Sequence, residues 1–175
     1  MHRNLMKLQI RPLVKNLRAW VYVNCWHMSG YESAAMWRLY AHAQASVCIR
    51  STYAKLRTLL PRGVFLGQVN YIDYEKHAIP FGEEHWSFIY KRKSFEHERE
   101  LRAVIVDMAS VFTSPPPKPP PDGILRPIKL ATLIDRVYIG PTAPAWLVRT
   151  VKVTLKQFGF AIPVKRSILD ESPMW

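Results

Sequence analysis

The sequence is poor in acidic residues and in cysteine and has no long apolar run, and each shortage excludes a class of protein. Among its 175 residues, 13 are Asp or Glu and 25 are Lys or Arg, so the formal net charge is +12. No apolar run reaches the roughly 18 residues of a transmembrane helix. The basic N-terminus lacks the continuous apolar core of a signal peptide. We therefore expect a cytoplasmic protein that does not bind membranes.

Only two cysteines are present, Cys25 and Cys48, and both lie in apolar, strand-like segments. Neither has another Cys or a His at the spacing of a zinc site, so no metal site is expected. We predict that both thiols are buried and unpaired, as is typical of a reducing cytoplasm. No cofactor is expected either.

The excess of cations favours an anionic ligand, either a nucleotide or a nucleic acid. On a helix predicted near the C-terminus, Arg149, Lys152 and Lys156 share one face and are candidates for phosphate contacts. The alternative is a solvated basic surface that only keeps the protein in solution. The sequence does not indicate an oligomeric state.

The size and the apolar content indicate one folding domain. A chain of 175 residues that is 49% hydrophobic can bury one sizeable core. We expect a basic N-terminal extension at residues 1–20 and a single globular domain at 21–175, without internal repeats. Residues 114–123, SPPPKPPPDG, predict a stiff polyproline loop inside that domain, since proline excludes a helix or a central strand. This loop is either a connector or a ligand for a partner domain.

The order of the segments predicts an α+β fold, with a mixed or mostly antiparallel sheet flanked by three to four helices. Strands are predicted at residues 21–26, 46–50, 64–74, 101–106, 133–139 and 160–164. Helices are predicted at residues 31–42, 51–60, 86–93 and 145–158.

Local signals refine two helix ends and the core. Ser29 and Glu32 have the spacing of a capping box before the first helix. Gly159 is expected to end the last helix. The most apolar segments predict a core formed by Trp26, Trp37, Leu39, Val104 and Ile105.

The most informative segment is KRKSFEHERELR, residues 91–102, where cations and carboxylates alternate directly before an apolar strand. In a strand, Glu98, Glu100 and Arg102 would share one face. Two carboxylates beside an arginine can bind a ribose or a guanidinium, or polarise a nucleophile. We therefore take Glu98 and Glu100 as candidate catalytic residues.

The cations of the same segment, Arg92, Lys93 and Arg102, are candidate ligand-binding residues. The alternative is a structural ladder of salt bridges, in which Lys91, Arg92 or Arg50 neutralises the carboxylates. Burying unpaired charge is costly, so either interpretation requires partners for Glu98. We expect Glu98 near Arg50 or His27 at the rim of the main pocket.

Other candidates lie at the ends of predicted strands. His27 follows the first strand, as a general acid or base or as a structural histidine. Arg50 and Ser51 precede a predicted helix, whose N-terminal amides would suit a phosphate; the alternative is that Ser51 only caps the helix. Tyr71 is placed either to stack on a base or to pack within the sheet.

Several phrases of the chain resemble a bacterial family catalogued as domain of unknown function 2971. They are VNCWHMSGYESAAMWRLY, IRSTYAKL, GQVNYIDYE, KRKSFEHERELRAVI and VYIGPTAPAW. The resemblance covers residues 21–175 and implies a shared fold and motif positions rather than a reaction. Members of that family usually carry a longer section before the CW motif, so the resemblance implies a shortened N-terminus here.

A fainter likeness is to ADP-ribosyltransferases, in which an early Arg or His, a serine-containing strand and a Glu-x-Glu pair occur in order. His27, Arg50 with Ser51, and Glu98 with Glu100 follow the same order. Here the serine directly follows the arginine, which departs from that pattern.

Two function classes follow from these observations. The first is a small enzyme that acts on a nucleotide or a nucleic acid through a charged cleft. The second is a non-catalytic basic module that binds nucleic acid or another acidic partner. A pocket that contains both glutamates with His27 and Arg50 would favour the enzyme. Glutamates locked to neighbouring cations would favour the module.

Overall fold

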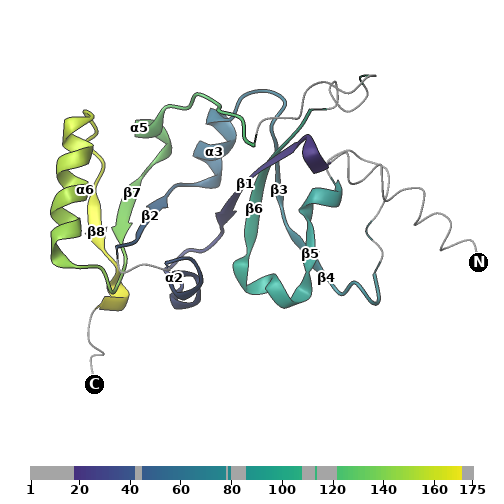
Figure 1. Ribbon diagram of the computed structural model, residues 1–175, viewed down its shortest axis with the longest axis horizontal. Helices are drawn as coiled ribbons and strands as arrows, with labels where there is room; N and C mark the ends of the chain where they lie inside the picture. Colours follow the sequence, from purple (N-terminus) through teal and green to yellow (C-terminus); the bar gives the residue numbers. More distant parts are fainter. Residues whose placement is uncertain are drawn as a thin grey trace, which may run out of the picture. The chain divides into compact units, whose positions relative to one another are not determined.

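The computed structural model describes residues 18–41, 45–77, 79, 86–107, 113 and 122–170, and the chain divides into two compact units. Unit 1 comprises Met1–Met28 and Arg62–Arg126, and unit 2 comprises Ser29–Pro61 and Pro127–Trp175. Both units combine helices with strands, and most strand pairs are antiparallel (Figure 1). The predicted α+β class is therefore confirmed.

Two parts of the predicted organisation concern residues that the structure does not describe. Most of the extension at 1–20 and most of the polyproline loop at 114–123 lie outside the described residues. The division into an extension and one domain stays a prediction.

Unit 1 is built on a three-stranded antiparallel sheet in the order β1-β6-β3. Its strands are β1 (Val21–His27), β3 (Phe65–Gln68) and β6 (Glu100–Val106). The β-branched run in β6 suits the central position, since both of its edges are paired and its side chains pack on neighbours. Val104 is fully buried there, and it lies opposite Val23 on one side and Phe65 on the other.

The strand predicted at 64–74 is in fact two strands that belong to different sheets. Strand β3 ends at Gln68, and β4 (Asn70–Ile72) pairs in parallel with β5 (Tyr90–Arg92). The break falls at Val69, whose side chain is buried and whose N–H donates to the carbonyl of Glu100 at 2.9 Å. An apolar run with period two continued through this residue, so the sequence pattern did not reveal the change of partner.

The helix predicted at 86–93 is only partly present. A 3-10 helix, η1 (Trp86–Ile89), is followed by strand β5 rather than by more helix. A second 3-10 helix, η2 (Lys93–Glu98), then leads into β6.

Unit 2 contains a second three-stranded sheet in the order β2-β7-β8. The strands are β2 (Val47–Arg50), β7 (Arg136–Ile139) and β8 (Val164–Arg166). Helix α6 (Ala145–Gln157) begins after Pro144 and ends before Gly159, whose φ of +75° suits glycine, as predicted. Helix α6 lies beside strand β8 (Figure 1). Ile139, Ala143 and Leu147 form a buried core cluster there.

The other elements of unit 2 are the short helices α2 (Ala34–Tyr40), α3 (Tyr53–Leu59) and α5 (Leu130–Leu133), and the 3-10 helix η3 (Ile168–Asp170). The predicted capping box was wrong, because Ser33 and not Ser29 caps α2 by accepting from the N–H of Met36 at 3.3 Å. Glu32 instead accepts from Trp37 Nε1 at 3.0 Å and from the N–H of Ile168 at 3.1 Å.

The predicted strands at 133–139 and 160–164 are also shifted. Residues 130–133 form α5, so the strand begins only at Arg136. The last strand, β8, begins where the predicted one ends, at Val164. Element types near the C-terminus were therefore predicted better than element limits.

The cysteines are unpaired, as predicted, but they are exposed rather than buried. Cys25 lies on β1 and Cys48 on β2, and both strands are edges of their sheets. An edge strand has a neighbour on one side only, so its apolar sequence does not guarantee burial.

The predicted core is correct for Val104 but wrong for Leu39, which is 45% exposed. Leu39 and the half-buried Trp37 lie on α2 of unit 2, whereas Val104 belongs to unit 1. Helix α2 has only seven residues and buries none of them. In the part of the chain that the structure describes, no helix is long and apolar enough to cross a membrane.

Candidate functional site

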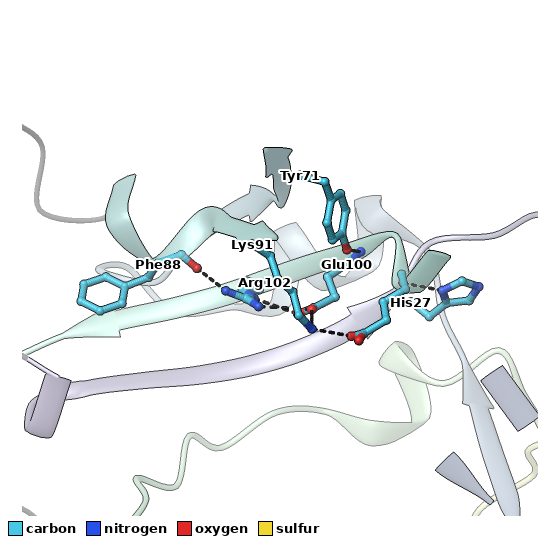
Figure 2. Close-up of polar contacts among 7 residues, drawn as sticks. His27, Tyr71, Phe88, Lys91, Glu100 and Arg102 are labelled. Carbon is cyan, nitrogen blue, oxygen red and sulfur yellow. Dashed lines mark hydrogen bonds and ion pairs between the residues drawn. The ribbon is translucent and has the colours of Figure 1, made fainter. Parts of the chain in front are cut away.

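The charged segment folds into a compact network in unit 1, which we call the charged cluster: Lys91, Glu98, Glu100 and Arg102. Lys91 Nζ lies 2.6 Å from Glu98 Oε2 and 2.6 Å from Glu100 Oε1 (Figure 2). Both carboxylates are buried. One ammonium group therefore bridges the two candidate catalytic residues.

Arg102 closes the other side of the cluster. Its Nε donates to Glu100 Oε2 at 2.8 Å, and one terminal nitrogen donates to Glu100 Oε1 at 3.1 Å. The guanidinium therefore binds the carboxylate in a bidentate manner. Its remaining terminal nitrogen donates to the backbone carbonyl of Phe88 at 2.5 Å (Figure 2). Glu100 is thus held by three charged hydrogen bonds.

The backbone brings Glu98 to the cluster in a way that the strand prediction did not foresee. Glu98 is the last residue of η2 and not part of β6, so the prediction of one strand face was wrong for Glu98. Arg99 follows in the left-handed conformation, with φ of 42° and ψ of 55°, and turns the chain from η2 into β6. Glu100 and Arg102 do share a face of β6, as predicted from their spacing.

Two further candidates contact the backbone of this segment. The N–H of Glu100 donates to the hydroxyl oxygen of Tyr71 at 2.8 Å, and Nδ1–H of His27 donates to the carbonyl of Glu98 at 2.6 Å (Figure 2). Nε2 of His27 is buried and has no hydrogen-bond partner among the described residues. Tyr71 and His27 therefore fix the ends of the Glu98 to Glu100 turn.

The electrostatics of the cluster keep Glu100 ionised. Burial alone would raise the pKa of Glu100, but hydrogen bonds from Arg102 and Lys91 outweigh it and lower the pKa to about 2. The same contacts raise the pKa of Lys91 and of Arg102 against the opposing effect of burial. Burial raises the pKa of Tyr71. Because the pKa of Glu100 is about 2, this carboxylate is unsuited to exchange protons near neutral pH.

The candidates Arg92 and Lys93 do not join this network. Both are exposed, and the Arg92 guanidinium lies 5.5 Å from the centre of the Tyr74 ring. Lys91 is an ion-pair partner of Glu98. The candidates Arg50 and Ser51 belong to unit 2.

The phosphate site predicted at the start of α3 is not built as expected. Ser51 Oγ donates to the carbonyl of Leu133 at 2.6 Å, and Thr52 Oγ1 caps α3 by accepting from the N–H of Lys55 at 3.3 Å. The Ser51 hydroxyl and one of the N-terminal amides of α3 are therefore engaged within the protein.

From the sequence, Lys91 is predicted only as one possible cation of the salt-bridge ladder. In the structure it is the centre of the charged cluster, because it bridges Glu98 and Glu100. The parallel pairing of β4 with β5 sets Lys91 in register with Tyr71 and so brings both residues to the same place. Cys25 was also missed as a neighbour of the cluster. Although Cys25 is exposed, partial desolvation of its thiol, and then Glu100, raise the thiol pKa. The antiparallel register of β1 and β6, which pairs Cys25 with Arg102, is the signal that would have found it.

No group of three metal-ligating side chains occurs among the described residues. Comparison with known proteins adds no relative: no family model, no curated protein and no solved structure matches the chain.

Proposed function

We propose that this protein is a basic module that binds nucleic acid or another polyanion, and that the charged cluster supports the fold. The observation that carries this proposal is the double contact of Lys91, whose ammonium lies 2.6 Å from the carboxylates of both Glu98 and Glu100. Glu100 accepts from both Lys91 and Arg102, so its carboxylate has little capacity left for a ligand.

The charge outside the cluster supports the same proposal. The chain has 25 Lys or Arg residues against 13 Asp or Glu residues. Exposed cations include Arg149, Lys152 and Lys156, which follow one face of α6. Cations spread over a surface attract phosphates with little sequence preference.

Binding of a labelled single-stranded oligonucleotide tests the proposal. We expect binding at low salt that weakens steeply as the salt concentration rises, because each phosphate contact releases a counterion. The variant in which Arg149, Lys152 and Lys156 are changed to Gln should bind more weakly and show a shallower salt dependence. No binding of the wild type at low salt would contradict the proposal.

A second candidate function is an enzyme that acts on a nucleotide, with Glu98 and His27 as its acid or base groups. The observation in its favour is the buried Nε2 of His27, which has no hydrogen-bond partner among the described residues, next to the backbone of Glu98. If the protein is such an enzyme, Glu98→Gln should abolish nucleotide binding and leave the melting temperature nearly unchanged. Isothermal titration with a nucleotide beside a thermal melt separates the two functions.

We also propose a cytoplasmic location and membership of the family catalogued as domain of unknown function 2971. The free state of Cys25 and Cys48 supports a reducing compartment. The phrases quoted above support the family, which has no assigned reaction. A fluorescent fusion in bacterial cells tests the location.

A further inference from the structure

The sheet of unit 2 has one face that α6 does not cover, and this face is rich in cations. In the antiparallel pair β2 and β7, Arg50 lies directly opposite Arg136, and in the parallel pair β7 and β8, Tyr138 is in register with Lys165. Paired residues and residues two apart share a face of a sheet. We call this set the arginine face: Arg50, Arg136, Tyr138 and Lys165.

The residues on the opposite face of the sheet pack under α6, which agrees with placing the arginine face on the other side. Ile139 lies in the core under α6, and Val164 packs against that core. Val137, two residues before Ile139, is buried as well. The alternate residues Arg136 and Tyr138 therefore point away from α6.

The cations of the arginine face are not neutralised by carboxylates. Among the described residues, no Asp or Glu forms an ion pair with Arg50, Arg136 or Lys165; the neighbouring Asp135 pairs with Lys55 on α3. Like charges directly opposite each other on two strands are destabilising. The placement of Arg50 against Arg136 is thus unfavourable for the protein alone.

Tyr138 holds the second arginine in position. A terminal nitrogen of Arg136 donates to the Tyr138 hydroxyl at 3.4 Å, and its guanidinium lies 5.9 Å from the centre of the Tyr138 ring. Nε of the same guanidinium is buried and has no acceptor among the described residues. Hydrogen bonds from Arg136, and then from Arg50, lower the pKa of the Tyr138 hydroxyl.

We propose that the arginine face is a phosphate-binding site, in which Arg50 and Arg136 hold one phosphate group between strands β2 and β7. A phosphate offers oxygens that match two guanidinium groups, and its charge removes the repulsion between them. Tyr138 is a positioning residue for Arg136, and Lys165 adds a further cation. The phosphate is that of a nucleic-acid backbone, a step that rests on the function proposed above.

Thermal melts with inorganic phosphate test the site itself. In dilute buffer without phosphate, Arg50→Gln is expected to raise the melting temperature, because it removes one of two facing cations. Phosphate should then raise the melting temperature of the wild type more than that of Arg50→Gln. Arg57→Gln, the same exchange at an exposed position of α3, is the matched control and should respond to phosphate like the wild type.

Lys165→Gln is a second variant on the same face and keeps the test valid if Arg50→Gln folds poorly. Its response to phosphate should also fall below that of Arg57→Gln. Equal responses of Arg50→Gln, Lys165→Gln and Arg57→Gln would overturn the site.

Oligonucleotide binding separates the site from the proposed function. We expect Arg50→Gln to bind a single-stranded oligonucleotide about tenfold more weakly than Arg57→Gln does. If the wild type binds no oligonucleotide at low salt but phosphate stabilises it through Arg50, the proposed function fails and the phosphate site stands. If the wild type binds and Arg50→Gln binds as tightly as Arg57→Gln, the site fails and the function stands.

Discussion

The charged cluster of unit 1 and the arginine face of unit 2 use the same residue types in opposite ways. On β6, Arg102 finds the carboxylate of Glu100 on its own strand at 2.8 Å. On β2 and β7, Arg50 lies opposite another arginine, and Arg136 donates to the hydroxyl of Tyr138. The charges of the first arrangement are paired, whereas the second has no carboxylate partner among the described residues.

This contrast separates structural charge from charge that is available for binding. Sequence density pointed to residues 91–102, because cations and carboxylates crowd together there. Cations and carboxylates that lie close together in the sequence can neutralise each other in the fold. A high density of charged residues is therefore a poor guide to a binding site. The cations of the arginine face are spread over three strands, β2, β7 and β8, and form no cluster in the sequence.

The largest expected effect is the loss of stability in Glu100→Gln. The variant keeps the shape of the side chain but leaves Arg102 and part of the charge of Lys91 uncompensated in a buried place. Breaking such a network costs about 3–5 kcal/mol in the free energy of unfolding, which urea denaturation measures.

Two controls sharpen the comparison. Glu98→Gln should cost less, since Lys91 retains Glu100 as its partner. Arg50→Gln, on the arginine face, should cost nothing. The contrast between the two regions breaks down if Arg50→Gln destabilises the protein as much as Glu100→Gln does.

The next effect concerns how the stability of the protein decreases at acidic pH. The pKa of Glu100 is about 2 in the folded protein, below its ordinary value of 4.5. A lowered folded-state pKa stabilises the protein fully above the ordinary value, and that stability is lost as the pH falls from about 5 towards 2. Melting temperatures measured across this window should fall steeply for the wild type and less steeply for Glu100→Gln. Equal slopes would mean that Glu100 is not the group responsible.

The smallest expected effect concerns the turn that brings Glu98 to the cluster. Arg99 has a φ of 42°, where a side chain with a Cβ is strained and glycine is not. Arg99→Gly should therefore raise the free energy of unfolding by about 1 kcal/mol or less, since relief of strain exceeds the added entropy of the unfolded chain. Arg99→Ala removes the same charge but keeps the Cβ, so it should give no gain. A gain in both variants would assign the effect to charge rather than to the backbone.

The sequence predicted those features that depend on local chemistry. Strands β1 and β6 follow from alternating or β-branched residues, and α6 follows from Pro144 and Gly159 at its ends. The face shared by Glu100 and Arg102 follows from the period of a strand. These signals lie within a few residues of the structures that they specify.

The features that the sequence did not reveal depend on distant partners. The chain changes its pairing partner from β6 to β5 around Val69, whose N–H still bonds to Glu100 of β6. Glu32 accepts from the N–H of the distant Ile168 instead of forming the predicted capping box. The centre of the cluster, Lys91, becomes visible only when β4 is known to pair with β5. The pairing of Arg50 with Arg136 is equally invisible before the register of β2 and β7 is known.

The alternation of the two units along the chain has a consequence for folding during synthesis. Unit 1 takes residues from both sides of Ser29–Pro61, and unit 2 takes residues from both sides of Arg62–Arg126. On a ribosome, β1 must wait for β6 to emerge, and β7 must emerge before β2 can pair. Pairing across such long loops is slow, because chain entropy is lost before contacts form. The edges of β1 and β2, with the free thiols of Cys25 and Cys48, therefore stay unpaired in the nascent chain for many seconds, on the order of its synthesis time.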